Sequence, residues 1–77
     1  MTQDEALGMI LRELRQADEQ HPGWPHDPVY GAAIMAEEAG EAIQAALDHH
    51  YKGGSLLHLK VELAQTGAMA IRALLNL

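Results

Sequence analysis

Two short breaks divide this chain of 77 residues into three stretches, and they limit the possible folds more than any other feature. The first break, residues 21–28, contains all three prolines. A proline restricts its own backbone and that of the residue before it away from the helical region. The second break is the pair Gly53-Gly54. Between the breaks the apolar residues recur at helical spacing, so we predict an all-α fold of three helices without strands.

Capping signals locate the ends of the first two helices. Thr2 and Glu5 have the spacing of a capping box, which predicts a helix start at the beginning of the chain. Asp27 followed by Pro28 is a favourable pair of N-cap and first helical residue. We therefore expect the second helix to begin there and to run to about Tyr51, before the glycine pair.

The third helix is expected to follow Ser55 as its cap and to run through Leu77, with apolar residues around nearly its whole circumference. That pattern is typical of a helix enclosed by neighbours. The prediction is one domain covering residues 1–77, in which a single small core supplies about 3 to 5 kcal/mol. Because the chain has no cysteine, we expect further stability from a bound metal or from assembly into a homo-oligomer, a dimer or a tetramer, that completes the helical bundle.

The charge balance bears on the possible partners. Five Lys and Arg residues stand against 11 Asp and Glu residues, a formal net charge of −6, which argues against binding to nucleic acid or to anionic membranes. The first five residues include two acidic and no basic side chains, and no apolar stretch has the length of a signal peptide or a membrane span. We predict a soluble, cytoplasmic protein.

The acidic residues of the second helix have no basic partners within it. Between Arg15 and Lys52 the chain carries seven acidic residues and no Lys or Arg. At about 100° per residue, Glu41 lies roughly 40° from Glu37 and roughly 60° from Glu38, so the three carboxylates share one sector of the helix. Carboxylates at this spacing repel one another, and a cation would resolve the conflict.

The third helix repeats this arrangement. Glu62 is followed three residues later by Gln65, and neither position four residues from Glu62 holds a Lys or Arg. Two antiparallel helices that present E-x-x-E and E-x-x-Q would surround a divalent cation with oxygens. Mg²⁺ prefers such ligands and leaves positions open for substrate phosphates. The two motifs together predict a Mg²⁺ site.

These motifs resemble a known signature. The sequence EEAGE at 37–41, followed by ELAQ at 62–65, is similar to the EExxE and ExxD motifs of the MazG-like all-α nucleoside triphosphate pyrophosphohydrolases. WPHD at 24–27 resembles small phage-like members. The resemblance covers the second and third helices. It implies a MazG-like helical bundle and a Mg²⁺-dependent hydrolase that converts NTP or dNTP substrates to the nucleoside monophosphate and pyrophosphate.

The resemblance also implies roles for individual residues. Glu38, Glu41 and Glu62 would be metal ligands, Gln65 would occupy the fourth ligand position, and Glu37 would be a supporting catalytic acid that orients water. Gln65 departs from the pattern because it brings a neutral amide oxygen where an Asp is expected. We expect this change to lower the metal affinity, to reduce the number of ions bound, or to mark a subgroup tuned differently; Asp48, seven residues after Glu41, is a less favoured substitute ligand. The implied reaction is metal-assisted attack of water on phosphorus, without a protein nucleophile.

The source of the phosphate-binding cations is a separate question. Domains of the family generally continue into a fourth helix, so we expect Lys52 or Arg72 to reach the phosphates across an oligomer interface. Trp24 either stacks on the nucleobase or covers the end of the bundle. His58 either contacts the bound phosphate or metal-bound water, or forms a hydrogen bond with Glu62.

Two alternatives complete the analysis. The five histidines invite a zinc site, but they include no regular i, i+4 metal pair, which favours loop and capping roles instead. The second alternative is that the chain is a catalytically impaired MazG-like helical module for oligomerisation or interaction. Formation of a monophosphate and pyrophosphate from nucleoside triphosphates would distinguish an enzyme from such a module.

Overall fold

Three helices account for most of the chain in a computed structural model that describes all 77 residues. They are α1 (Gln3–Gln20), α2 (Pro28–Lys52) and α3 (Leu56–Leu75). The side chains of Thr2, Asp27 and Ser55 each accept a hydrogen bond from a backbone N–H of the following helix, as expected of N-caps. The predicted all-α fold of three helices, without strands, is confirmed. None of the three helices combines the length and the apolar character that crossing a membrane requires.

The helix ends follow local chemistry. Gly53 ends α2 in the left-handed conformation, with φ of 69°, which glycine adopts without steric cost. Helix α3 ends at Leu75, so the prediction that it runs through Leu77 is wrong by two residues. The side-chain amide of Asn76 donates a hydrogen bond of 2.7 Å to the carbonyl oxygen of Arg72. Such a local side-chain bond competes with continuation of the helix.

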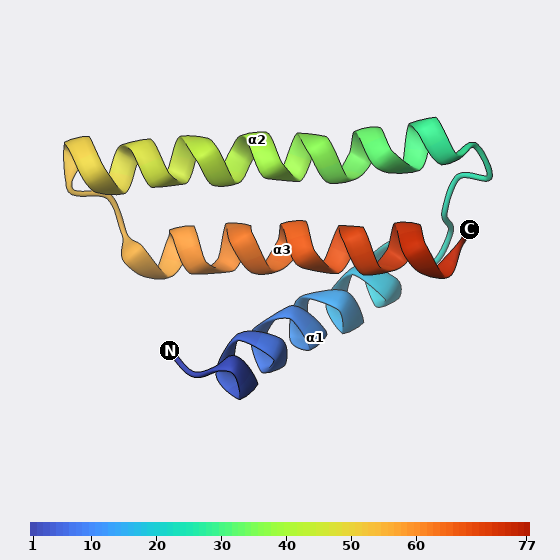
Figure 1. The fold of residues 1–77 in the computed structure, drawn as a ribbon, viewed down its shortest axis with the longest axis horizontal. Coiled ribbons are helices and arrows are strands. Elements are labelled where there is room, and N and C mark those ends of the chain that lie inside the picture. Colours follow the sequence, from blue (N-terminus) through green and yellow to red (C-terminus); the bar gives the residue numbers. More distant parts are fainter.

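Helix α3 lies between the other two helices (Figure 1). It runs antiparallel to α2, and α1 crosses it obliquely on the side away from α2 (Figure 1). Helix α3 packs against both neighbours, whereas α1 and α2 do not pack against each other. The segment that joins α1 to α2 passes the C-terminal end of α3 (Figure 1). The molecule measures 39 × 25 × 20 Å.

The buried core consists of small side chains. Its apolar members are Ala42, Ala45, Ala64, Ala68 and Met69, which line the contact between α2 and α3 and part of the contact with α1. Alanines allow two helix backbones to approach closely, but they bury little apolar area. No large side chain is fully buried, and α1 buries no residue.

Much apolar surface is therefore left exposed. The accessible surface is 5472 Å², whereas a compact monomer of this mass would expose about 4,600 Å². Helix α3 was expected to be enclosed, yet Leu63 is 55% exposed and Leu74 is 69% exposed. The reason is that α3 has only two neighbours, which cannot cover its whole circumference.

Candidate metal centre

Three glutamates from α2 and α3 come together midway along these helices. Glu38 and Glu41 lie one turn apart on α2, and the antiparallel α3 places Glu62 opposite them. One carboxylate oxygen from each residue lies within 4.8 Å of the others. Glu38 and Glu62 are partly buried, and Glu41 is exposed. We refer to Glu38, Glu41 and Glu62 as the acidic centre.

The acidic centre contains buried oxygens without partners. Oε2 of Glu38 and Oε2 of Glu62 are both buried and form no hydrogen bond. Burial, together with the negative charge of Glu41, raises the pKa of Glu38 and the pKa of Glu62 above their ordinary values. Buried polar atoms in folded proteins are nearly always paired, so each of these oxygens needs a partner: an ordered water, a bound ion, or a proton shared with a neighbouring carboxyl group such as Glu41 beside Glu62.

No basic side chain of the protein neutralises the acidic centre fully. The only ion pair that reaches it is formed by Nε2 of His58 and Oε1 of Glu62, 3.8 Å apart and one turn apart on α3. His58 counts as a cation only when it is protonated, and its side chain is 60% exposed. The contact brings His58 beside Glu62, but at 3.8 Å it is longer than the hydrogen bond that sequence analysis gave as one of two alternatives for His58.

The donor set suits a hard divalent cation. Three carboxylates on two helices supply oxygen ligands within 4.8 Å of one another, and two of their buried oxygens have no hydrogen-bond partner in the protein. Mg²⁺ is usually bound through one or two carboxylates and keeps the rest of its coordination shell for water and substrate phosphates. The residues present therefore fit the ion that the sequence predicts.

Gln65 lies one turn beyond Glu62 on α3, next to the acidic centre but turned toward a third helix. Its Nε2 donates a hydrogen bond of 3.4 Å to Oε2 of Glu13 on α1. Sequence analysis missed Glu13, because a contact between α1 and α3 leaves no local signal at 62–65. A usable signal did exist, since Glu13 shares the apolar face of α1 with Ile10 and Ala17 at i+3 and i+4 spacing.

A cavity of about 440 Å³ adjoins the acidic centre. Its walls come from all three helices and from the segment before α2, and they include Glu13, Trp24, Glu38, Gln65 and Arg72. Its volume lies within the range of small-molecule sites. The cavity thus shares Glu38 with the acidic centre and extends from it toward the C-terminal end of α3.

Arg72 forms the far wall of this cavity and is held by several groups of the same chain. Its Nε lies 3.1 Å from Oδ1 of Asp18, and its Nη2 donates to the carbonyl oxygens of His21 and Gly23. The guanidinium also lies over the ring of Trp24, 4.9 Å from the ring centroid. These contacts fasten the segment after α1 to the end of α3.

Trp24 is fixed on a second side by α2. A Cβ atom at Gly31 would lie 3.0 Å from Nε1 of Trp24, so the indole would have to shift by a few tenths of an ångström to accept alanine there. Packed between Arg72 and Gly31, the indole covers the end of the bundle, and it also lines the cavity. The structure thus places Trp24 and Arg72, two of the predicted substrate-binding residues, at one cavity beside the predicted metal ligands.

Lys52 and Glu37 are not brought to the acidic centre. Lys52 is the last residue of α2, roughly 16 Å along the helix axis from Glu41 at 1.5 Å per residue. Its Nζ lies 3.9 Å from Oδ1 of Asp48. Glu37 is exposed on α2 and is not a member of the acidic centre.

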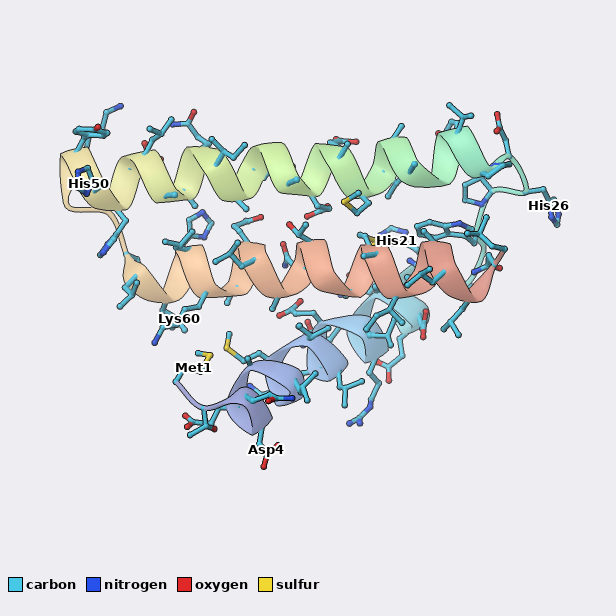
Figure 2. The ribbon with its side chains drawn as sticks, in the orientation of Figure 1. Met1, Asp4, His21, His26, His50 and Lys60 are labelled. Carbon is cyan, nitrogen blue, oxygen red and sulfur yellow. The ribbon has the colours of Figure 1, made fainter.

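The histidines lie in separate parts of the molecule. Figure 2 shows His50 beside the turn between α2 and α3, whereas His21 and His26 lie toward the opposite end. Nδ1 of His49 is 2.8 Å from the carbonyl oxygen of Gly54. This contact helps to close the turn between α2 and α3. No histidine belongs to a group of residues that could hold a metal ion.

Comparison with protein-family models, with curated proteins and with solved structures finds no match. The proposed function therefore rests on the resemblance of the EEAGE and ELAQ motifs and on three structural features. These are the acidic centre, the cavity beside it and the residues that hold both in place.

Proposed function

We propose that the protein is a Mg²⁺-dependent pyrophosphohydrolase that converts nucleoside triphosphates, of the ribo or deoxyribo series, to the monophosphate and pyrophosphate in the cytoplasm. The observation that carries the proposal is a set of three carboxylates within 4.8 Å of one another, two of them with buried oxygens that lack any partner. A cavity large enough for a small molecule adjoins them. Cation binding and substrate binding would thus occur side by side.

In this proposal the acidic centre holds Mg²⁺, and Gln65 supplies a neutral oxygen from the next turn of α3. Bound Mg²⁺ supplies charge neutralisation for the phosphates and for the departing pyrophosphate. The three carboxylates that would bind the ion are held in place by two antiparallel helices, and alanines line the contact between these helices. Glu37 lies outside this group, and its role as a supporting acid that orients water stays a prediction.

The nucleoside part of the substrate would occupy the cavity. Arg72 and Trp24 form its far wall, and Nη1 of Arg72 takes no part in the contacts that hold the guanidinium. Those N–H groups can donate to an anionic or carbonyl oxygen. Lys52, far along α2 from the acidic centre, can act on phosphates only if it comes from another subunit.

A second copy of the chain is proposed to cover the exposed apolar surface. A groove of about 370 Å³ between α2 and α3 is lined by Ala39, Ala42, Ile43, Ala46, Leu59, Leu63 and Thr66. Leu63 also borders an apolar hollow between α1 and α3, so the two areas are continuous. The protein exposes about 900 Å² more than a compact monomer of its mass. A standard interface covers about 800 Å² on each partner.

The oligomer is tested by light scattering coupled to size-exclusion chromatography. Leu63→Glu places a charge in the apolar groove and is expected to weaken association at least about 100-fold, as for a residue central to an interface. Val29→Glu makes the same charge change at a residue that is 76% exposed and outside the groove, and it should leave the oligomer intact. A monomeric wild-type chain would contradict the proposal.

The hydrolase is tested by product analysis. A panel of ribo- and deoxyribonucleoside triphosphates is incubated with the protein and Mg²⁺, and the products are separated to detect monophosphate and pyrophosphate. Glu38→Gln and Glu62→Gln are expected to lower kcat/KM by at least about 100-fold, because each removes a charged ligand. Glu19→Gln, an exposed acid on α1, is the matched control and should retain the wild-type rate.

The exposed apolar surface also favours a second candidate function, a helical module for oligomerisation without catalysis. Fourteen large apolar or aromatic side chains are exposed, and an exposed apolar patch that is contiguous marks an interaction site. If the protein forms stable oligomers yet yields no monophosphate from any nucleotide of the panel, this candidate replaces the hydrolase.

A further inference from the structure

Glu13 is the one acidic residue of α1 that lines the cavity beside the acidic centre. It is partly buried, and none of the ion pairs in the structure includes it. Its hydrogen-bonding partner is the Gln65 amide, whose Nε2 donates to its Oε2 over 3.4 Å. The contact joins residues 52 positions apart in the sequence.

This contact determines which way the Gln65 amide faces. A carboxamide has a donor end and an acceptor end, whereas an ionised carboxylate can only accept hydrogen bonds. With Glu13 on one side, the nitrogen of Gln65 faces α1 and its carbonyl oxygen is directed elsewhere. The reverse orientation would set the carbonyl oxygen against the carboxylate and lose the hydrogen bond.

The charge of Glu13 also reaches the acidic centre. It is one of the charges that raise the pKa of Glu62, after burial and the charge of Glu41. Gln65 follows Glu62 by one turn and shares the cavity wall with Glu38. Glu13 and Gln65 therefore form a link from α1 to the ligand groups of α2 and α3.

We propose that Glu13 is a positioning residue that holds the Gln65 carboxamide with its oxygen available to the cation of the acidic centre. The proposal rests on the proposed function, because it concerns the same Mg²⁺ site. It gives α1, which has no contact with α2, a part in metal binding. It also explains how an amide serves where a carboxylate would otherwise supply the fourth ligand.

The orientation of the amide is tested first in the metal-free protein by NMR. The side-chain amide signals of Gln65 are identified by their disappearance in Gln65→Glu. In Glu13→Ala these signals are expected to move toward the positions of a solvent-exposed amide, because the charged acceptor is gone. In Glu19→Ala, which removes an equal charge from the same helix, they should stay in place. Unchanged Gln65 signals in Glu13→Ala would overturn the proposal.

Metal affinity is measured with Mn²⁺, whose free form is counted by electron paramagnetic resonance. Glu13→Ala is expected to weaken binding about tenfold, the usual effect of losing a partner that orients a ligand. Glu19→Ala should bind within about twofold of wild type. Alanine is the best helix former, so both variants keep α1 intact, which circular dichroism verifies.

Exchanging the two side chains is expected to restore the metal affinity that Glu13→Ala loses. In the double variant E13Q/Q65E the amide and the carboxylate exchange places, so the hydrogen bond forms in the opposite direction and the total charge equals that of wild type. We expect Mn²⁺ affinity equal to or above wild type, because position 65 now brings a carboxylate. Affinity as low as that of Glu13→Ala would overturn the proposal.

The two proposals fail in distinguishable ways. If wild type binds Mn²⁺ and Glu62→Gln does not, while Glu13→Ala behaves like Glu19→Ala, the metal site stands and the role of Glu13 is refuted. If wild type binds no Mn²⁺, the proposed function is refuted, and with it the ligand role of Gln65.

Discussion

Two regions of this small protein bury charge, and they do so in opposite ways. At the C-terminal end of α3, the Arg72 guanidinium meets Asp18, two backbone carbonyl oxygens and the face of Trp24. Midway along α2 and α3, the acidic centre has two buried oxygens without a hydrogen bond and no Lys or Arg beside it.

This difference distinguishes a charge that is paired within the protein from a charge that is available to bind a ligand. A buried charge whose partners all come from the protein is compensated, so removing one partner leaves the other unpaired and lowers stability. A buried charge without protein partners destabilises the fold until a ligand arrives. Arg72 belongs to the first kind and the acidic centre to the second, so substitutions in the two regions should change stability in opposite directions.

The largest effect is expected from Arg72→Met. This change keeps the apolar volume of the side chain but removes the partner of Asp18 and of the carbonyl oxygens of His21 and Gly23. The free energy of unfolding, measured with urea, should fall by about 2 kcal/mol, since charged hydrogen bonds are lost but Asp18, 58% exposed, regains contact with water. Arg72→Lys keeps the charge without the fork of N–H groups, and it should lower the free energy of unfolding by less than Arg72→Met does. A loss below about 1 kcal/mol in Arg72→Met would remove the contrast between the regions.

At the acidic centre, removal of a charge is expected to raise the free energy of unfolding. In metal-free protein at pH 7, Glu62→Gln removes an uncompensated charge and should raise the free energy of unfolding by about 1 kcal/mol. Added Mg²⁺ should stabilise wild type and leave Glu62→Gln nearly unchanged. Glu19→Gln, which removes an exposed charge, should stay within about 0.5 kcal/mol of wild type in urea unfolding. Destabilisation by Glu62→Gln without metal would show that the carboxylate is paired after all.

Two glycines of α2, one near each of the two regions, allow side-chain packing in the regions to be compared. A Cβ at Gly40, near the acidic centre, would meet no atom within 4 Å, whereas a Cβ at Gly31 would press on the Trp24 indole. Gly40→Ala should therefore gain the helix preference of alanine, about 0.5 to 1 kcal/mol. Gly31→Ala should fall short of that value by about 1 to 2 kcal/mol. Thermal unfolding of both variants measures the difference, and equal gains would mean that Trp24 is not fixed.

The smallest effect concerns pH. Because the pKa values of Glu38 and Glu62 are raised in the folded protein, the folded state binds more protons than the unfolded state. Their contribution to stability is therefore fully present below the unfolded value of 4.5 and is lost as pH rises through the raised pKa values. The advantage of Glu62→Gln over metal-free wild type should grow from near zero below pH 4.5 toward pH 7. An advantage that does not vary with pH would contradict the raised pKa of Glu62.

The local parts of the fold could be predicted from the sequence. The caps at Thr2, Asp27 and Ser55 and the left-handed Gly53 depend on residues within one turn of each other, and all four are present. The end of α3 was misplaced because the Asn76 side chain competes for a backbone carbonyl, an effect that apolar periodicity does not register.

The same distinction between local patterns and long-range contacts applies to the site residues. Glu38, Glu41 and Glu62 were named as ligands by the motif resemblance, and the structure brings their oxygens together, whereas Glu37, which helical spacing places in the same sector, is not in the group. Glu13 was missed, since its contact with Gln65 depends on how α1 crosses α3. Arg72 was assigned to phosphates as a spare cation, and only the tertiary structure reveals its contacts with Asp18 and with the segment after α1.

The most direct test of the account is a calorimetric titration of Mg²⁺ into metal-free protein at pH 7, with wild type and Glu62→Gln compared in the same buffer. The account predicts saturable binding to wild type and affinity at least about tenfold weaker in the variant, because a buried oxygen that lacks a partner becomes a ligand. No saturable binding to wild type, or equal binding to both proteins, would contradict it.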